Sequence, residues 1–217
     1  MQDPYSQVLT LVLLVLTRWI LHDYMFRTFT DNNQVPIHWI KTRKIIYGRV
    51  VRAVDGDGIR ITHLPMLERW CQPAQAGDPK ETLYIRLAGI DAPESACFGQ
   101  PDQPFAQIAK SWLGSYLNGR IVRVQLLRRD QYNRLIGMVW VNPAWWPVLP
   151  TRNVSIEMLR RGLAVMYRAT GAQYGGNPTQ FNRVEQTAKA MRRGLWKSGD
   201  QFETPLEFKK RTRAMHG

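Results

Sequence analysis

The chain has 217 residues, 44% of them hydrophobic and 22% charged, which fits one globular domain with appendages and excludes both two full domains and wholesale disorder. Its 30 lysines and arginines outnumber its 17 acidic residues, and the resulting net charge of +13 indicates a polyanionic partner: nucleic acid first, an anionic membrane surface second. Two cysteines, Cys71 and Cys97, exclude a disulfide-rich scaffold and a four-cysteine zinc module; we favour two free thiols, and a single disulfide remains open.

The first forty residues differ from the rest of the chain. An apolar run at 8–16, VLTLVLLVL, continues beyond Arg18. No Lys or Arg precedes the run and no A-x-A site follows it, which disfavours a cleaved secretory signal. We therefore expect 1–26 to be a hydrophobic membrane anchor in a single-pass protein whose bulk stays on the side of synthesis; the alternative is a core helix of the globular domain. Residues 27–40 carry turn formers and are expected to be a linker.

From residue 41 onward the periodicity indicates strands and helices. Alternating, β-branched stretches predict strands at 45–54, 59–63, 83–90, 121–127 and 135–141. Helical spacing predicts helices at 104–117, 154–161 and 181–191, and prolines and glycines predict an inserted loop at 64–82. Five strands, with a helix between the third and fourth, favour an α+β fold: an OB-type β-barrel with three helices over 41–200. A basic tail follows at 201–217.

Acidic residues gather around one arginine of the third predicted strand. The Asp-Gly-Asp sequence at 55–57 alone is typical of a tight turn. Arg86, however, lies within an apolar strand, where an arginine needs a partner, and Asp91 and Glu94 follow at the strand's end. We therefore expect Asp57, Asp91 and Glu94 to converge beside Arg86, held together by arginines or a metal. Oxygen-only ligands favour a hard ion such as Ca²⁺.

A second basic segment, 128–134, joins the fourth and fifth predicted strands. Taken alone, this segment is typical of a solvated hairpin turn. Beside the acidic cluster, its arginines fit the second arm of a phosphate clamp, because the planar guanidinium donates two parallel hydrogen bonds to phosphate oxygens. The four histidines lack ligand spacing and are expected to be surface or packing residues.

These motifs, in the order Asp-Gly-Asp, Arg-x-x-x-x-Asp-x-Pro-Glu and Asp-x-Tyr-x-Arg, resemble those of the thermonuclease (staphylococcal or micrococcal nuclease) family over about 44–197. The apolar N-terminus, the 64–82 insertion and the stretch at 158–167 are most similar to the membrane-anchored, mitochondrial thermonuclease-like endonucleases of fungi. The resemblance implies a mitochondrial membrane location.

The resemblance also implies a role for each matching residue. Two carboxylates and one backbone carbonyl would hold the metal: Asp57, Asp91 and the carbonyl of Ala92. Glu94 would be the general base, Arg86 and Arg134 would grip the scissile phosphate, and Tyr132 would belong to the nucleotide pocket. Gly58 and Ala92 depart from the bacterial pattern, which has Thr at both positions. Tyr167 lies one residue out of register with the tyrosine that stacks on the substrate base.

The function implied is a Ca²⁺-dependent, membrane-anchored endonuclease that hydrolyses phosphodiester bonds of DNA or RNA with low sequence specificity. No obligate protein partner is inferred. The alternative is a catalytically inactive thermonuclease-like module that binds nucleic acid or protein. Such modules usually lack a clamp arginine or the glutamate, whereas Arg86, Glu94 and Arg134 are all present here. A basic membrane-surface protein without a nucleic-acid role would leave the acidic cluster unexplained.

Overall fold

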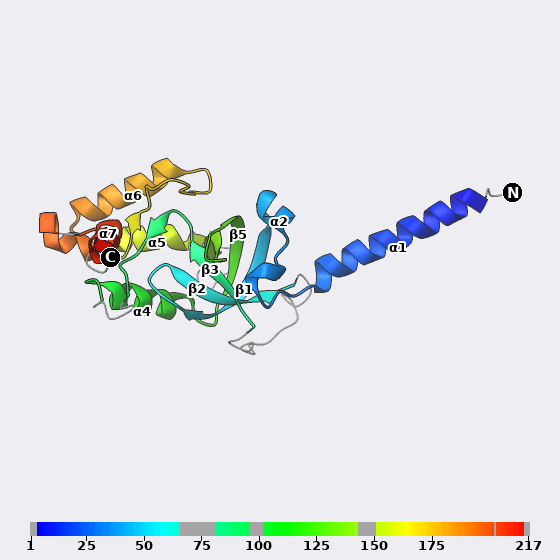
Figure 1. Ribbon diagram of the computed structural model, residues 1–217, viewed down its shortest axis with the longest axis horizontal. Coiled ribbons are helices and arrows are strands. Elements are labelled where there is room, and N and C mark those ends of the chain that lie inside the picture. Colours follow the sequence, from blue (N-terminus) through cyan, green and yellow to red (C-terminus); the bar gives the residue numbers. More distant parts are fainter. Residues whose placement is uncertain (1–3, 66–80, 96–101, 143–150, 202, 215–217) are drawn as a thin grey trace.

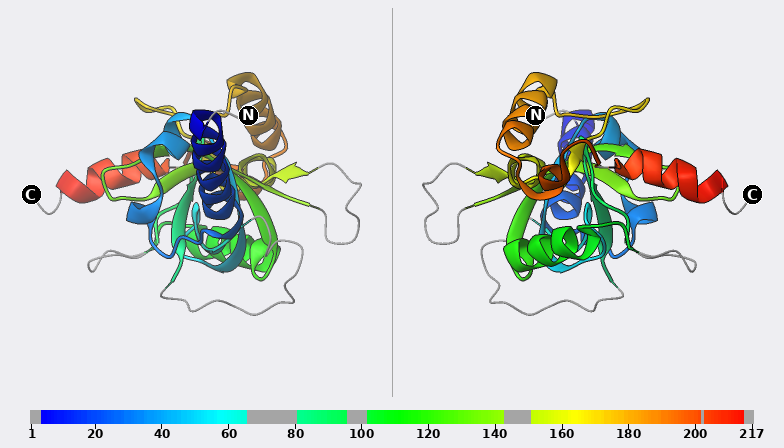
Figure 2. Two further views of the ribbon diagram at one scale, coloured as in Figure 1. Left: turned by 90° about the vertical axis from the view of Figure 1, so that its right-hand side faces the viewer. Right: turned by 90° about the vertical axis from the view of Figure 1, so that its left-hand side faces the viewer.

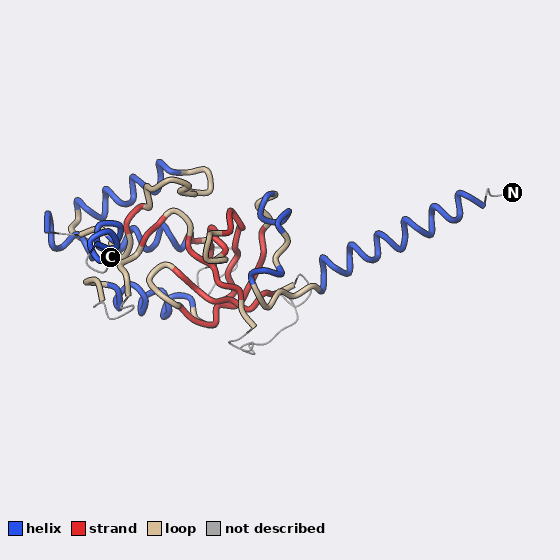
Figure 3. The backbone as a smooth tube through the Cα atoms, viewed as in Figure 1, coloured by secondary structure: helices blue, strands red, loops and turns tan. Residues whose placement is uncertain are grey.

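The structure, a computed structural model, describes residues 4–65, 81–95, 102–142, 151–201 and 203–214 (Figure 1). Most of the expected insertion at 64–82, and both cysteines, lie outside these residues. The centre of the molecule is a closed barrel of five strands, shown in red in Figure 3. Its strands are β1 (Ile45–Ala53), β2 (Gly58–Leu64), β3 (Leu83–Leu87), β5 (Ile121–Arg129) and β6 (Leu135–Val141).

The barrel closes through one parallel pair. Antiparallel pairing runs in the order β3-β2-β1-β5-β6, and β3 then pairs with β6 in parallel. Buried residues alternate along β1 and β5, as a strand with one face on a core requires. Inward residues such as Ile59, Ile85 and Val124 are fully buried. The predicted α+β barrel is confirmed, and its five strands are those that alternation indicated.

Helices cover the barrel on opposite sides (Figures 1 and 2). α4 (Ala106–Leu117) packs on β1, while α5 (Val154–Arg161) packs on β6 and on α6 (Pro178–Ala190). Three two-residue strands were not expected: β4 (Ile90–Asp91), which pairs with β8 (Val165–Met166), and β7 (Arg152–Asn153), which pairs with β6. The end of the expected domain forms η2 (Gly194–Gln201), and the expected tail forms α7 (Pro205–Ala214), where Phe208 is buried.

The segment expected to be a linker packs against the barrel instead. Between 27 and 41 the chain forms η1 (Asn32–Gln34) and α2 (Ile37–Lys41). The side chains of Phe29, Val35 and Trp39 are buried in the same core as the barrel residues, and the rings of Phe29 and Trp39 meet edge to face at 5.1 Å. Burial of these large apolar groups makes the segment part of the globular domain.

The N-terminal apolar stretch is helical but does not fit the expected anchor. α1 (Pro4–Phe26) extends away from the barrel (Figures 1 and 2). Among the described residues, no helix combines the length and the apolar character needed to cross a membrane. The uninterrupted run at 8–16 rises about 1.5 Å per residue and covers less than half of a hydrocarbon core of roughly 30 Å. The prediction of a single-pass membrane protein is wrong, and with it the mitochondrial membrane location that the resemblance implied.

Candidate active site

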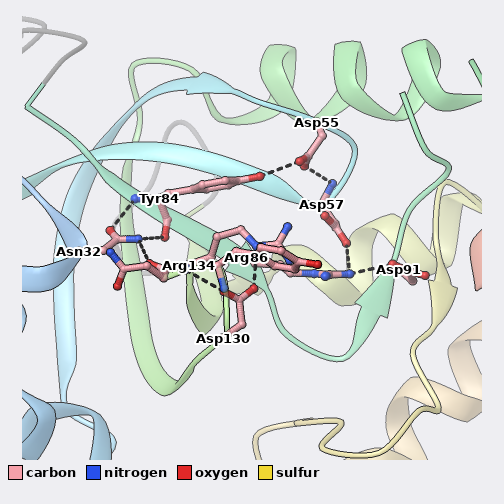
Figure 4. Close-up of polar contacts among 10 residues, drawn as sticks. Asn32, Asp55, Asp57, Tyr84, Arg86, Asp91, Asp130 and Arg134 are labelled. Carbon is pink, nitrogen blue, oxygen red and sulfur yellow. Dashed lines mark hydrogen bonds and ion pairs between the residues drawn. The ribbon is translucent and has the colours of Figure 1, made fainter. Parts of the chain in front are cut away.

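Arg86 joins two carboxylates that come from different parts of the chain. Its Nη2 donates to Asp57 Oδ2 at 2.9 Å and to Asp91 Oδ1 at 2.7 Å (Figure 4). The β2–β3 register pairs Gly58 with Arg86, which brings the turn carrying Asp57 beside the arginine, and β4 supplies Asp91 five residues later. The Asp57 carboxylate raises the pKa of Arg86 above its usual range, and Asp91 adds to this effect. This part of the expected cluster is present.

A second hydrogen-bonded pair in this turn was not anticipated. Asp55 Oδ2 accepts from the Tyr84 hydroxyl at 2.7 Å, and Asp55 Oδ1 accepts from the Asp57 backbone N–H at 3.2 Å. Burial and the Asp57 carboxylate raise the pKa of Asp55, and burial together with Asp55 raises the pKa of Tyr84. The pair ties the end of β1 to β3. The Asp-Gly-Asp sequence that contains Asp55 is typical of an ordinary turn, so the sequence did not indicate this contact.

Gly58 is needed for the Asp55–Tyr84 contact. A Cβ at position 58 would lie 2.6 Å from Asp55 Oδ1 and 2.7 Å from the Tyr84 hydroxyl oxygen. A side chain there would displace one or both groups. The departure from threonine noted in the sequence therefore makes room for a hydrogen bond at the edge of the site.

The turn between β5 and β6 fixes Arg134 through Asp130. Asp130 Oδ1 accepts from the backbone N–H groups of Tyr132 and Arg134, each at 2.9 Å, and Asp130 Oδ2 accepts from Arg134 Nε at 2.7 Å. Burial opposes the ionisation of Asp130, but the hydrogen bonds from Arg134 outweigh it, so the pKa of Asp130 lies below its usual value. Tyr132 is 65% exposed, and the Arg134 guanidinium carbon lies 5.4 Å from its ring centroid.

A buried asparagine of the N-terminal segment braces the same turn. Asn32 Nδ2 donates to the backbone carbonyls of Tyr84 at 3.1 Å and Asn133 at 2.7 Å, and Asn32 Oδ1 accepts from the Tyr84 N–H at 2.8 Å (Figure 4). Arg129 Nη2 donates to the Asn32 carbonyl at 2.7 Å. The segment predicted to be a linker therefore holds the strand of Arg86 against the turn of Arg134.

These elements surround one cavity of about 730 Å³. Its described lining includes most of the predicted site residues: Asp57, Arg86, Ala92, Glu94, Tyr132 and Arg134. Asp91 is 3% exposed and is not among the described lining residues; it reaches the site through Arg86. Tyr167 also lines the cavity, with its ring centroid 5.8 Å from the Arg86 guanidinium carbon. The loop at 170–173, which sequence reasoning did not identify, completes the wall.

The loop after β4 is held by contacts of Ala92 and of the Glu94 backbone. The backbone of Glu94 exchanges two hydrogen bonds with Gln103: its N–H donates to the side-chain oxygen at 3.1 Å, and its carbonyl accepts from the Gln103 N–H at 2.9 Å. Ala92 packs so closely on the preceding turn that a Cβ on Gly56 would lie 2.6 Å from the Ala92 Cβ. Both loops are therefore held in fixed positions at the cavity wall.

The donor atoms beside Arg86 suit a hard cation in kind. Asp57 and Asp91 present carboxylate oxygens from two segments, which is the ligand type that Ca²⁺ prefers. Within the described part of the chain, no group of three or more His, Cys, Asp or Glu side chains is arranged to hold a metal ion. The positive charge shared by the two carboxylates here is the guanidinium of Arg86.

Comparison with known proteins places the chain among nucleases. A family model described as staphylococcal nuclease homologue matches residues 84–198. A protein of Penicillium rubens named "Probable endonuclease lcl3" is 40% identical over 221 residues, which cover 94% of this chain and 75% of that protein. A protein of Clavispora lusitaniae named "Probable endonuclease LCL3" is 41% identical, with 86% of this chain and 82% of that protein covered. "Endonuclease Htp3" of Saprolegnia parasitica is 38% identical over 86% of each chain.

Proposed function

The chain belongs to the staphylococcal nuclease homologue family, and we propose that it is an endonuclease that hydrolyses phosphodiester bonds of DNA or RNA with low sequence specificity. The observation that carries the proposal is the convergence of Arg86 and Arg134, from two elements, on one cavity that Glu94 also lines. Two guanidiniums suit the extra negative charge of a phosphodiester under attack. Groups of this kind contact phosphate and not base edges, which accounts for low sequence specificity.

Each side chain of the site receives a role in the proposal. Arg134, fixed by Asp130, would donate to the equatorial oxygens of the scissile phosphate, and Arg86 would donate from the neighbouring strand β3. Glu94 would accept a proton from the attacking water as general base. The exposed ring of Tyr132 would contact the nucleotide next to the cleaved bond.

Calcium dependence is part of the proposal. Asp57, Asp91 and the backbone carbonyl of Ala92 would hold the ion. When bound, Ca²⁺ would polarise the phosphate as a Lewis acid. Arg86 would keep the two carboxylates close together, because one of its nitrogens donates to both.

The proposal is tested by nuclease assays of the full chain with Ca²⁺ and with EGTA, together with Glu94→Gln. We expect Glu94→Gln to lower kcat about 10²–10⁴-fold with nucleic-acid binding nearly unchanged, because a general base contributes to the chemical step and not to affinity. Glu81→Gln, at an exposed carboxylate outside the described cavity lining, is the matched control and should keep wild-type kcat.

Binding of nucleic acid without cleavage by the wild type would favour the inactive-module alternative. Equal losses of binding and cleavage in Glu94→Gln would make Glu94 a structural residue or a ligand. Full activity in EGTA would remove calcium from the proposal and leave the nuclease assignment standing.

A further inference from the structure

The tetrapeptide Arg-Arg-Gly-Leu occurs twice, at 160–163 and at 192–195. The first copy ends α5 and the second follows the end of α6. Both glycines have positive φ, 66° at Gly162 and 52° at Gly194, and both leucines are buried. Neither copy contributes a residue to the described lining of the catalytic cavity.

The two copies meet backbone to backbone at their glycines. A Cβ on Gly162 would lie 2.1 Å from the carbonyl oxygen of Arg193, and a Cβ on Gly194 would lie 2.2 Å from the carbonyl oxygen of Gly162. The Leu195 N–H donates to the Gly162 carbonyl at 2.8 Å. This close approach places the two arginine pairs beside each other, and all four side chains are exposed; we call them the arginine cluster: Arg160, Arg161, Arg192 and Arg193.

Three of the four arginines are held by specific contacts. Arg160 forms an ion pair with Glu157, and Arg193 Nη1 donates to the Arg160 carbonyl at 3.1 Å. The Arg161 guanidinium carbon lies 5.1 Å from the ring centroid of Trp112 on α4. Side chains that are already positioned lose less conformational freedom when they bind a ligand. Three arginines of the cluster are therefore already partly ordered.

Arg192 has a backbone conformation that favours glycine. Its φ is 47°, and it lies just after the C-cap residue of α6, Met191, where helices commonly end on a glycine in the left-handed region. An arginine at such a position is strained by its Cβ. Arg192 is nevertheless exposed, so packing of its side chain does not account for the residue.

Local electrostatics does not account for four arginines. A helix C-terminus carries roughly half a negative charge, so the ends of α5 and α6 together offset about one of the four positive charges. Among the described contacts of the cluster, Glu157 offsets another. About two positive charges remain, and like charges at close range repel.

We propose that the arginine cluster binds the phosphate backbone of a nucleic-acid strand outside the cleavage cavity. The choice of nucleic acid as the partner rests on the proposed nuclease function. The loop at 170–173 that lines the cavity precedes α6, whereas Arg192 and Arg193 follow it. A helix of 13 residues rises about 20 Å, which separates Arg192 and Arg193 from that loop, so we expect a strand longer than a dinucleotide to be needed to contact both the cavity and these two arginines.

The test compares a long strand with a dinucleotide as substrates of the full chain. The variant replaces Arg161, Arg192 and Arg193 with Gln and leaves the Arg160–Glu157 ion pair intact. We expect KM for the long strand to rise about tenfold and the salt slope of binding to fall by about 0.7–0.9 for each phosphate that the variant no longer neutralises. Cleavage of the dinucleotide should stay within about twofold of wild type, because no catalytic group is touched.

The matched control removes the same charge elsewhere by replacing Lys41, Arg43 and Arg52 with Gln, three exposed cations of α2, β1 and the turn between them. If the control and the cluster variant weaken long-strand binding equally, only net charge matters and the proposal fails. If cleavage of the two substrates falls together in the cluster variant, the cluster supports the fold and the proposal also fails.

Arg192→Gly separates binding from stability. Glycine relieves the positive-φ strain, so this variant should be at least as stable as wild type in thermal unfolding and should still bind the long strand less tightly. Unchanged binding would contradict the role of Arg192.

If wild type cleaves neither substrate, the nuclease proposal fails, but the fluorescence anisotropy of a labelled strand still measures whether the arginine cluster binds nucleic acid. If the cluster variant loses binding to anionic vesicles but binds the strand as tightly as wild type, the proposal that the cluster binds nucleic acid fails.

Discussion

At the scale of single residues, the position of Tyr84 depends on the absence of a side chain at position 58. The Tyr84 hydroxyl donates to a half-buried carboxylate of Asp55, and hydrogen bonds to charged groups contribute about 1.5–3 kcal/mol. A Cβ at position 58 would lie 2.6 Å from Asp55 Oδ1 and 2.7 Å from the Tyr84 hydroxyl oxygen, so a side chain there would clash with both groups. The contact therefore couples the conformation of the acidic turn to the strand that carries Arg86.

We expect Gly58→Ala to lower the free energy of unfolding by about 1–3 kcal/mol, because the added Cβ forces Asp55 or Tyr84 to move. Gly114→Ala in α4 is the matched control. Its Cβ would have no neighbour closer than 3.6 Å, and Ala in a helix interior should stabilise by about 0.5–1 kcal/mol. Urea unfolding of both variants checks the prediction, and equal shifts in the same direction would contradict it.

Asn32 is the residue that links the N-terminal segment to the site. Its side chain satisfies three backbone groups, two of Tyr84 and one of Asn133, and a buried polar group left unsatisfied costs about 1–3 kcal/mol. Asn32→Ala should therefore destabilise the protein by at least about 2 kcal/mol and lower kcat, because the turn of Arg134 loses its brace.

Asn33→Ala is the control for Asn32, since Asn33 is adjacent and exposed and its hydrogen bond to Asp31 uses its backbone N–H. It should change neither stability nor turnover. Thermal unfolding and kcat of the two variants test this prediction. If Asn32→Ala is as active as Asn33→Ala, Asn32 does not support the turn of Arg134.

At the scale of elements, sequence pattern predicted what periodicity encodes. β6 and α5 have the predicted bounds, because alternation and helical spacing continue through seven and eight residues. β4, β7 and β8 were missed because two residues carry no period. Arg86, Asp57 and Asp91 were expected to meet and do. Their supporting partners, such as Asn32, depend on contacts as many as 101 residues apart, which local composition does not reveal.

The contrast between α1 and the segment after it can be tested with two phenylalanines. Phe29 is 2% exposed in the core, so Phe29→Ala should lower the free energy of unfolding by about 3–5 kcal/mol. Phe26, at the end of α1, is 49% exposed, and Phe26→Ala should stay within about 0.5 kcal/mol of wild type. Chemical denaturation measures both. A small effect of Phe29→Ala would indicate that the segment between 27 and 41 does not contribute to the core and acts as a linker.

At the scale of the whole molecule, closing the barrel also assembles the site. The parallel pair of β3 and β6 aligns Ile85 with Leu135, which brings Arg86 and Arg134 to neighbouring positions. The acidic turn joins through the β2–β3 register. Since the site depends on barrel closure, conditions that destabilise the barrel also remove the site.

We expect acid to be such a condition, with His63 on β2 as the titrating group. His63 is 5% exposed, and its ring lies 4.9 Å from that of Phe29. Burial, and to a smaller degree the charge of Lys44, lower the pKa of His63 to about 4. In the unfolded chain its pKa is about 6.5, so below that pH the unfolded state binds more protons than the folded state.

The stability that neutral His63 provides is therefore complete above about pH 6.5 and is lost as the pH falls toward 4, by an amount on the order of 3 kcal/mol. We expect the free energy of unfolding of His63→Gln to fall less between pH 7 and pH 4 than that of wild type, because only the carboxylates then contribute to the loss. His38→Gln, at an exposed histidine of α2, should keep the wild-type pH dependence. Urea unfolding across this range measures all three proteins. Parallel curves for wild type and His63→Gln would show that His63 is protonated in the folded barrel, and the acid sensitivity would then belong to other groups.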